Sequence, residues 1–440
     1  MDAKLIVDEV RLTPILISDP PLLNVQGVHQ PFTPRLVVEV ITRGGVSGLG
    51  ETYGDGVYLD LARPLAEALP GHPVTDVNAL FTLATATDPT PATGATSATA
   101  PALVAEEPDA GVSAAGLRGV RTAEKLRLSV VSAFETACLD ALGKTLGLPV
   151  HALLGGKVRD TVEYSAYLFY RWAAHPGAEA ADDWGPALDP AGIVAQARRF
   201  DRLHGFRSFK LKGGVFEPER EIAAIRALAE AFPGRPLRLD PNGAWSVETS
   251  LAVARELDGV LEYLEDPASG TGAMAEIAAR TDVPLATNMC VTTFEEVPEA
   301  FAKGAVRIVL CDHHYWGGLG RTRELAALCR TYGVGLSMHS NTHLGISLAA
   351  MTQVAATLPE LHHACDTHYP WQTEDVVTTR PVFRDGRLAV SDAPGLGVDL
   401  DRPALASLHR RWLDDDGTLR DRDDAAAMRR ADPAWRPSTW

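Results

Sequence analysis

The fold is decided by eight short apolar runs between residues 162 and 366. They read VEYSAYL (162–168), SFKLK (208–212), LRLD (237–240), LEYLE (261–265), LATN (285–288), RIVLCD (307–312), GLSMH (335–339) and HHACD (362–366). Amphipathic helical runs separate them, such as PEREIAAIRALAEAF (218–232) and RTRELAALCRTY (321–332). Such alternation indicates parallel strands whose faces are covered by helices. Eight units of this kind predict a closed barrel of the TIM type.

The polar side chains that end these runs are evenly spaced along the chain. From the second run onward they lie 23 to 28 positions apart, and they are Lys212, Asp240, Glu265, Asn288, Asp312, His339 and Asp366. Barrels of this type build their active sites at the carboxyl ends of successive strands. One polar residue at such an end is ordinary, whereas an unbroken series of ionisable or amide residues predicts a catalytic site.

The composition of the whole chain fits a globular protein with a large core. Its 440 residues are enough for one large barrel with an attached domain, and 46% of them are apolar. The 57 acidic and 41 basic residues give a net charge of −16. This charge argues against nucleic acid or an anionic membrane as a partner, because both repel it. A small anionic substrate stays open if cations gather at its site.

Nothing in the sequence directs the chain to a membrane or to an oxidising compartment. No apolar run approaches the ~20 residues of a membrane span. The N-terminus lacks a basic segment followed by an apolar one. The five cysteines are scattered and form no CxxC pair, which favours reduced thiols over disulfides or structural zinc. We therefore expect a cytoplasmic protein.

Before the barrel, the sequence predicts an antiparallel sheet and a long helix. RLVVEVITR (35–43) and VSGLGETYG (46–54) alternate apolar and polar residues on either side of Gly44-Gly45, which is typical of a hairpin. Residues 124–146 carry apolar residues at helical spacing. Residues 84–119 are rich in Ala, Thr, Pro and Gly, and they predict a mobile loop or a lid.

The chain after residue 380 is expected to return to this sheet. VFRDGRLAVSDAPGLGV (382–398) indicates a hairpin that turns at Asp385-Gly386, followed by a short helix. The sequence therefore predicts an α/β protein, a modified TIM (β/α)8-type barrel with an α+β capping domain. We expect residues 1–158 and 380–440 to form the cap and residues 159–379 to form the catalytic barrel.

Three oxygen-bearing residues end neighbouring strands of the predicted barrel. Asp240, Glu265 and Asn288 form the all-oxygen set that Mg²⁺ prefers in proteins. Asp266 directly follows Glu265 and is a rival ligand. Strand alternation lets only one of the two point inward, and Pro267 turns the chain away at this point. We therefore expect Glu265 to bind the metal.

Lys210 and Lys212 lie on the strand before these residues, and the period of two places both on one face. Two ammonium groups inside a barrel repel each other, so we expect a lowered pKa for one or both. Such a lysine can act as a general base near pH 7. In the alternative interpretation, the pair lies exposed on the surface.

Asp312 and His339 end the sixth and seventh strands, across the predicted ring from Lys212. A carboxylate bound to one imidazole nitrogen fixes the tautomer and raises the basicity of the other nitrogen. A metal between two opposed bases suits abstraction of a proton next to a carboxylate, with the cation stabilising the developing charge. Supporting, core or surface positions are expected for His313, His314, His343, His362 and His363.

Taken together, these residues resemble the enolase superfamily and, within it, the glucarate dehydratase family. The resemblance spans nearly the whole chain and rests on GVHQPF (27–32), AYLF (166–169), FKLKGG (209–214), LDPNGAWS (239–246), EDP (265–267), ATNM (286–289), MHSNTHLGIS (338–347), DTH (366–368) and PGLGV (394–398). It implies a capped barrel, a bound Mg²⁺ and dehydration of a diacid sugar. The implied reaction converts D-glucarate into 5-dehydro-4-deoxy-D-glucarate. A homo-oligomer is also expected.

The resemblance implies a role for individual residues. Lys212 would remove the C5 proton of D-glucarate, and His339, paired with Asp312, would serve the opposite C5 configuration, as in L-idarate. His339 would also protonate the departing 4-hydroxyl. Lys210 and Asn242 would hold the reacting carboxylate. The residues similar to the family's substrate contacts are His29, Tyr167, Ser340, Asn341, His368 and Arg422.

Parts of the chain depart from the family pattern. Thr122 is the candidate for a threonine contact before the helix 124–146, and RDRDDAAAM (420–428) can be aligned on Arg420 in place of Arg422. Residues 84–119 and 55–69 also follow the family poorly, in the region that would read the distal end of the substrate. Three other functions stay open: a dehydratase of another aldarate or aldonate, a racemase or epimerase with the same bases, and a non-catalytic barrel that binds an acid sugar.

Overall fold

The computed structural model describes residues 2–87, 122–178, 182–437 and 439–440, and it contains the predicted barrel. The eight barrel strands are β6 (Thr161–Phe169), β7 (Phe209–Lys212), β8 (Leu237–Asp240), β9 (Tyr263–Glu265), β10 (Leu285–Thr287), β11 (Ile308–Cys311), β12 (Gly335–Met338) and β13 (Cys365–Thr367). Neighbours in this series pair in parallel from β6 to β12, and β13 pairs with β6. The barrel is nearly closed: β12 and β13 form no ladder, but Leu336 of β12 bridges to Leu361 before β13, and Ser337 Oγ donates to the carbonyl oxygen of Ala364 at 3.0 Å.

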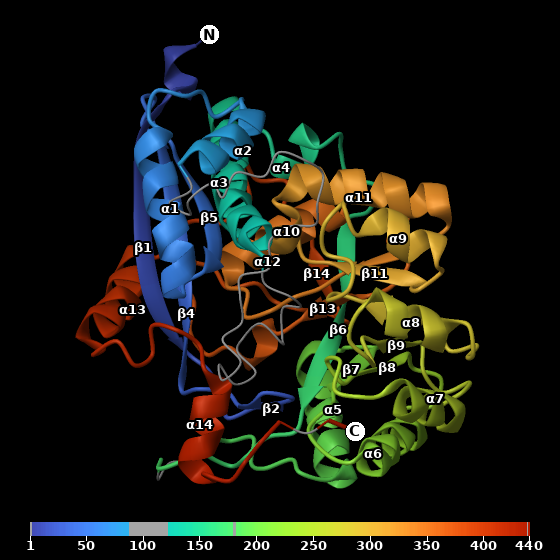
Figure 1. Cartoon of the computed structure of the whole chain (residues 1–440). Coiled ribbons are helices and arrows are strands. Elements are labelled where there is room, and N and C mark those ends of the chain that lie inside the picture. The colour runs from blue at the N-terminus through green and yellow to red at the C-terminus, as the bar shows by residue number, and fades with distance from the viewer. Residues whose placement is uncertain (1, 88–121, 179–181, 438) are drawn as a thin grey trace.

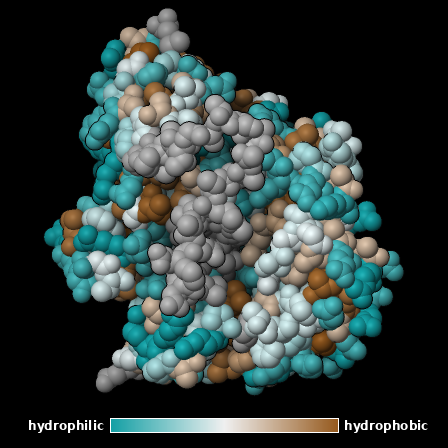
Figure 2. All heavy atoms as spheres, viewed as in Figure 1, coloured by the Kyte–Doolittle hydropathy of each residue, from teal (hydrophilic) through white to brown (hydrophobic). Residues whose placement is uncertain are grey.

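Helices alternate with these strands and cover the outside of the barrel (Figure 1). They are α5 (Pro190–His204), α6 (Pro218–Ala231), α7 (Val247–Glu256), α8 (Thr271–Ala278), α9 (Val297–Ala302), α10 (His313–Trp316), α11 (Leu319–Tyr332) and α12 (Gly345–Ala355). Their apolar faces join the barrel strands in one large core, and Tyr263, Ala286, Ile308 and Leu310 form a second, smaller cluster on β9 to β11. The face drawn in Figure 2 is largely hydrophilic, with hydrophobic side chains in small groups between the hydrophilic ones.

The predicted antiparallel sheet lies beside the barrel and is built from β1 (Val7–Ser18), β4 (Phe32–Thr42) and β5 (Ser47–Tyr53). The predicted long helix is α3 (Ala123–Leu146), which packs directly on β5. A Cβ atom at Gly50 would lie 1.9 Å from the carbonyl oxygen of Ala133. Only glycine therefore allows the helix and the strand to approach this closely.

Smaller elements complete the N-terminal part and the outer edge of the barrel. They are η1 (Ala3–Leu5), β2 (Leu23–Asn24), β3 (Gly27–Val28), α1 (Gly56–Ala68), α2 (Val77–Ala86), α4 (Val150–Leu153) and η3 (Tyr369–Trp371). The predicted loop 84–119 begins later than expected, because α2 continues to Ala86, and residues 88–119 lie outside the described residues. The five cysteines are buried thiols. No helix of the described residues has the length and apolar character needed to cross a membrane.

The hairpin predicted after residue 380 is present as an antiparallel bridge between Arg384 and Arg387, but it joins the barrel and not the N-terminal sheet. The predicted turn at Asp385-Gly386 is present, with positive φ at both residues, but the strand that follows, β14 (Arg387–Ala389), pairs antiparallel with β6 of the barrel. The helices that come next do return to the N-terminal sheet. Helix α13 (Arg402–Asp414) packs on β1, and α14 (Asp424–Ala431) packs on β3 (Figure 1). The domain limits given above stay a prediction.

A buried ion pair joins the N-terminal sheet to the barrel. The Arg35 guanidinium donates two hydrogen bonds of 2.6 and 2.9 Å to Glu51 Oε1. Glu51 also accepts from the backbone N–H groups of Leu344 and Ser347, both at 2.9 Å, where α12 begins. Burial alone would raise the pKa of Glu51, but Arg35 and these N–H groups hold it below its usual range. The carboxylate is therefore charged and acts as a clasp between sheet and barrel.

Replacing Glu51 by alanine is expected to lower the free energy of unfolding by about 3–5 kcal/mol, because it leaves a fully buried guanidinium without its partner. Urea unfolding followed by tryptophan fluorescence measures this change. The control is Glu9→Gln, which breaks an exposed pair with Arg11 and is expected to leave the unfolding curve unchanged. Equal shifts for the two variants would contradict the clasp.

Candidate active site

The carboxyl end of β7 carries both predicted lysines into the barrel interior. Lys210 is fully buried and Lys212 is 6% exposed, so the alternative of a surface pair is wrong. The Lys212 Nζ atom lies 2.6 Å from Asp240 Oδ2 on the next strand, and the two residues are paired in the parallel ladder. The predicted register of β7 and β8 is therefore confirmed by a direct contact between their side chains.

The predicted lowering of the lysine pKa is wrong for Lys210. Burial alone would lower the pKa of Lys210, but three carboxylates surround the ammonium and raise it well above its ordinary value. These are Glu265 at 2.5 Å, Asp366 at 2.9 Å and Asp240 at 3.3 Å. The repulsion expected between the two lysines is outweighed by acids from three other strands. Lys210 is thus a fixed positive charge.

Asp240, Glu265 and Asn288 end three consecutive strands, as predicted. Asp240 and Glu265 both lie within 3.3 Å of Lys210 Nζ, so their carboxylates face the same interior space. Asn288 follows β10, and both polar atoms of its side chain are buried without a hydrogen-bond partner. Burial and the neighbouring charge of Asp240 raise the pKa of Glu265.

An Mg²⁺ ion fits this set of side chains. The Asp240 and Glu265 carboxylates lie close together beside Lys210, and the Asn288 amide oxygen next to them is buried without a donor. All three can supply the oxygen ligands that Mg²⁺ prefers. These residues could hold the ion, and the cation would satisfy each of them.

Asp266 is directed away from this set. Its carboxylate accepts hydrogen bonds from Thr287 Oγ1 at 2.5 Å and from the Asn288 backbone N–H at 2.8 Å. Burial raises the pKa of Asp266 to about 7. Asp266 thus connects the ends of β9 and β10, which agrees with the preference for Glu265 as the ligand.

Asn242 lies in the turn that follows β8. Its φ of 52° is left-handed, a conformation that asparagine tolerates better than most residues. Its backbone N–H donates to Asp240 Oδ1 at 3.0 Å, and its side-chain Oδ1 is buried without a partner. The turn therefore presents an amide beside the proposed metal ligand, as the resemblance implies.

The predicted pair of Asp312 and His339 is present at the ends of β11 and β12. The His339 Nδ1 atom lies 3.1 Å from Asp312 Oδ2. A carboxylate can only accept, so Nδ1 carries the proton and Nε2 stays available. Burial lowers the pKa of His339 despite the opposing effect of Asp312, and the positive charges of Lys210 and Lys212 lower it further.

Two further histidines share the same aspartate. His314 Nδ1 lies 2.8 Å from Asp312 Oδ1, and His343 Nε2 lies 3.7 Å from Oδ2. Burial favours a raised pKa for Asp312, but the interactions with His314 and His339 hold it well below its ordinary value. These histidines therefore support the site in a specific way: they stabilise the ionised form of Asp312, which binds His339.

The strand order places the two bases at opposite ends of one arc. The sheet runs from β7, which carries Lys212, through β8, β9 and β10 to β11 and β12, after which His339 follows. The three oxygen ligands end β8, β9 and β10, between the two bases. The site can therefore accept a proton from either side of a substrate carboxylate held near these ligands.

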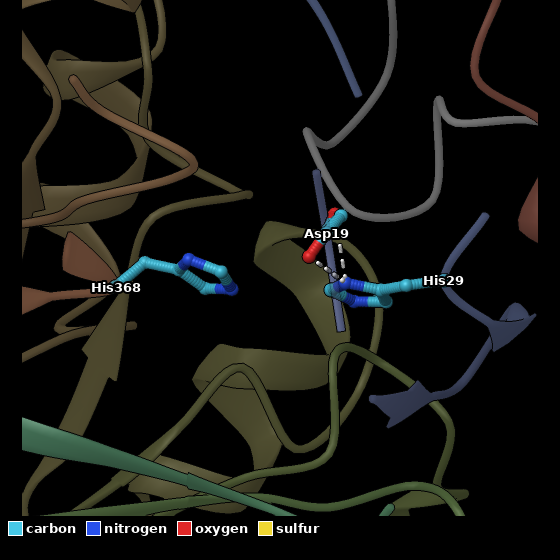
Figure 3. A group of neighbouring side chains, drawn as sticks. All are labelled: Asp19, His29 and His368. Atoms are coloured by element: carbon cyan, nitrogen blue, oxygen red, sulfur yellow. Dashed lines mark hydrogen bonds and ion pairs between the residues drawn. The ribbon is translucent and has the colours of Figure 1, made fainter. Parts of the chain in front are cut away.

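The predicted substrate contacts His29, after β3, and His368, after barrel strand β13, come together where the N-terminal part meets the barrel mouth. Their rings stack with centroids 6.1 Å apart, and Asp19 binds His29 Nδ1 at 3.2 Å (Figure 3). Both ring nitrogens of His368 are buried without a partner, and burial lowers the pKa of His368 to about 3. A neutral imidazole with two unused nitrogens is suited to bind a polar ligand.

The structure favours Arg422 over Arg420 at this location. Arg422 is 7% exposed, its guanidinium binds Asp424 at 2.9 Å, and its charge acts on Asp19 and His368. The Arg420 guanidinium instead binds the backbone carbonyl of Asp415 and lies over the Trp412 ring. The positive charge near the histidines therefore comes from Arg422.

The remaining predicted contacts are distributed around the barrel mouth. The Tyr167 hydroxyl accepts from Lys210 at 3.0 Å and donates to Asp366 at 3.1 Å. Ser340 Oγ donates to the Asn341 carbonyl oxygen at 2.9 Å, just after His339. Thr122 caps the N-terminus of α3 by accepting from the Lys125 backbone N–H at 3.1 Å, and its contact with a substrate stays a prediction.

Sequence reasoning left two acids of this site without a role. Asp366 was recognised as a strand end, yet its pairing with Lys210 and with Arg238 at 3.3 Å was not foreseen. Asp19 was not selected at all, because it follows an ordinary strand and precedes Pro20-Pro21. Its only sequence signal is its position before the GVHQPF motif.

A capped barrel that carries acids, amides and bases at its strand ends is typical of a barrel enzyme. Comparisons with known proteins show to which family this chain is related. Residues 192–404 match the family model "Enolase C-terminal domain-like". The chain is 71% identical to a probable glucarate dehydratase from Streptomyces coelicolor over 99% of this chain and 98% of the relative.

Two solved structures are similar over the whole length. One is an enolase from Thermobispora bispora complexed with magnesium and formate, with 52% identity, 99% of both chains covered and a TM-score of 0.91. The other is an enolase from Mycobacterium smegmatis complexed with tartrate, with 50% identity, 100% and 99% coverage and a TM-score of 0.90. The chain belongs to the enolase superfamily. Within it, the chain is glucarate dehydratase-like and a carbon–oxygen lyase.

Proposed function

We propose that the protein removes water from a diacid sugar, D-glucarate, in an Mg²⁺-dependent reaction that yields 5-dehydro-4-deoxy-D-glucarate. The observation that carries the proposal is the arc of Asp240, Glu265 and Asn288 between Lys212 and the His339–Asp312 pair. The 71% identical relative is named a probable glucarate dehydratase, and a similar structure contains magnesium. Both support the same chemistry.

The first step is removal of the proton at C5, next to a carboxylate. Lys212 in its neutral form accepts this proton, and the C5 electron pair moves into the carboxylate to give an enediolate. Bound Mg²⁺ would supply charge stabilisation of several kcal/mol for that carboxylate. Lys210 is held charged by its three acids, and it adds a fixed positive charge beside the same group, together with the Asn242 amide.

The second step is loss of the 4-hydroxyl. The enediolate electrons form the C4–C5 double bond as the C4–O bond breaks. The departing oxygen takes the proton that His339 carries on Nε2 in its doubly protonated form, and it leaves as water. Asp312 holds the opposite nitrogen of the ring at 3.1 Å, so Nε2 is the nitrogen that exchanges the proton. The enol at C5 then becomes the ketone of the product.

Chelation tests the metal requirement directly. EDTA is expected to abolish keto-acid formation from D-glucarate, because the enediolate then lacks the cation that would stabilise its charge. Added Mg²⁺ is expected to restore the rate, whereas Na⁺ at the same ionic strength restores nothing. A semicarbazide assay for the keto acid measures the outcome. Full activity after EDTA and dialysis would contradict the magnesium site.

A racemase or epimerase is the second candidate, favoured by the two bases at opposite ends of the arc. Such an enzyme returns a proton to the opposite face of the carbon and eliminates no water. Incubation of aldarates in D₂O distinguishes the two functions. Incorporation of deuterium without keto acid would support epimerisation, and keto-acid formation supports the dehydratase.

A further inference from the structure

Asp19 is held in place by residues of the N-terminal part and by His175 of the barrel. Its backbone N–H donates to the carbonyl oxygen of Pro31 at 2.9 Å, and its own carbonyl oxygen accepts from His175 Nε2 at 2.7 Å. Its side chain accepts from Thr33 Oγ1 at 2.6 Å. The residue is 5% exposed. Three contacts thus fix both the backbone and the carboxylate of Asp19.

The fixed carboxylate controls the ring of His29. His29 Nδ1 lies 3.2 Å from each Asp19 oxygen, and since a carboxylate offers no proton, Nδ1 must be the donor. The ring is further confined by Phe169, edge-on at 5.8 Å, and by His368, stacked at 6.1 Å (Figure 3). Nε2 is therefore the polar atom that Asp19 leaves for a ligand.

The charges around this pair match a carboxylate ligand only if His29 is held as a donor. Arg422 brings one positive charge, but Asp424 and Asp19 bring two negative ones. His368 is neutral because of its burial. Asp19 would repel an incoming carboxylate that approached it directly. The His29 ring lies against Asp19, with Nδ1 3.2 Å from both of its oxygens, and so separates the Asp19 carboxylate from a ligand at Nε2.

We propose that Asp19 is a positioning residue that orients His29 toward the distal carboxylate of a diacid substrate, and thereby sets the preference for diacids over monoacids. The inference rests on the proposed function, because it deepens the substrate class of the same site. The Asp19 carboxylate binds His29 Nδ1 and Thr33 Oγ1, so its effect passes through the orientation of His29.

Calorimetric titration of ligands tests the proposal. The titrations use Mg²⁺-loaded protein with Lys212→Ala, so that D-glucarate is bound and not consumed. Adding Asp19→Asn keeps the shape and removes the charge, and it is expected to weaken D-glucarate binding about 10- to 100-fold, the cost of losing a charged hydrogen bond. Binding of the monoacid D-gluconate is expected to stay within about two-fold, because it has no distal carboxylate.

Two further variants separate positioning from simple structural damage. Thr33→Val loosens the Asp19 carboxylate and should weaken diacid binding in the same direction but less. The His29→Ala variant and the double variant Asp19→Asn/His29→Ala should lose the same diacid affinity. The effects of two substitutions are not additive when the two residues act as one unit. The matched control is Asp392→Asn, which alters an Asp–His pair with His151 at 3.0 Å outside this site.

The outcomes are distinct. Equal losses for D-glucarate and D-gluconate, or additive losses in the double variant, would overturn the role of Asp19. Failure of the unmodified enzyme to produce keto acid from any aldarate would overturn the proposed function instead. The binding comparison gives its answer in either case, since it does not depend on turnover.

Discussion

The Lys212→Ala variant is expected to lose deuterium exchange at C5 of D-glucarate by about 10²- to 10⁴-fold, the range supplied by a general base. Lys212 lies at the end of β7 with its Nζ atom 2.6 Å from Asp240. Alanine removes the proton acceptor while the metal ligands and Lys210 stay in place. Proton NMR in D₂O measures the exchange, and keto-acid formation should fall in parallel.

The stereochemical control uses the second base. L-Idarate presents the opposite configuration at C5, which His339 is expected to serve, so its exchange should survive in Lys212→Ala. His339→Asn should give the converse pattern. Lys303→Ala changes an exposed lysine paired with Glu299 and should alter neither substrate. Loss of exchange from both diacids in Lys212→Ala would mean that Lys212 holds the substrate and does not act as its base.

Glu265→Gln is expected to abolish Mg²⁺ binding at working concentrations and to lower activity by about 10³-fold, because the cation supplies several kcal/mol of charge stabilisation. Glutamine keeps the size of the side chain and one oxygen. It removes the charge that faces Asp240 across Lys210. Calorimetric titration with Mg²⁺ measures the affinity, and the rate is then followed as Mg²⁺ is raised.

The matched substitution for this experiment lies on the same segment. Glu262 immediately precedes β9 and binds Arg238 and His363 at the other end of the barrel. Glu262→Gln should keep the Mg²⁺ affinity of the unmodified protein, although it can lower stability. Normal Mg²⁺ binding by Glu265→Gln would identify another ligand, and Asp266 would be examined next.

The barrel could be predicted because each strand carries its own signal. The apolar runs that end in Lys212, Asp240 and Glu265 are local features, and their spacing follows from the length of one helix and two loops. All eight predicted strands are confirmed. The long helix 124–146 and the hairpin around Gly44-Gly45 are confirmed for the same reason, since periodicity and turn residues lie within one short window.

The electrostatics could not be predicted, because they depend on residues far apart in sequence. The spacing of Lys210 and Lys212 predicted that the two ammonium groups repel each other and that a lysine pKa is lowered. Asp366, which is 156 residues from Lys210, binds the Lys210 ammonium and helps to raise its pKa instead. Likewise, His343, which lies 31 residues after Asp312, comes within 3.7 Å of its carboxylate. These charged side chains come close to one another only when the strands that carry them assemble into the barrel.

The C-terminal part shows the limit of local patterns in another way. Asp385-Gly386 correctly predicted a turn, but a turn does not say which strand its second arm will pair with. The second arm, β14, pairs with the first residues of β6, which precede the part of β6 that pairs with β13 and β7. Pairing partners are decided by the assembled sheet and not by the hairpin sequence.

The Arg35–Glu51 clasp has a consequence for engineering. Glu51 belongs to the sheet, yet it fixes the peptide groups of Leu344 and Ser347, a few residues after His339. Replacing this cap by one from another protein, in order to bind other diacids, would therefore remove the hydrogen bonds that fix the segment after His339. A successful chimera would have to transplant β4 and β5 intact, or limit its changes to the loops that surround Asp19 and Arg422.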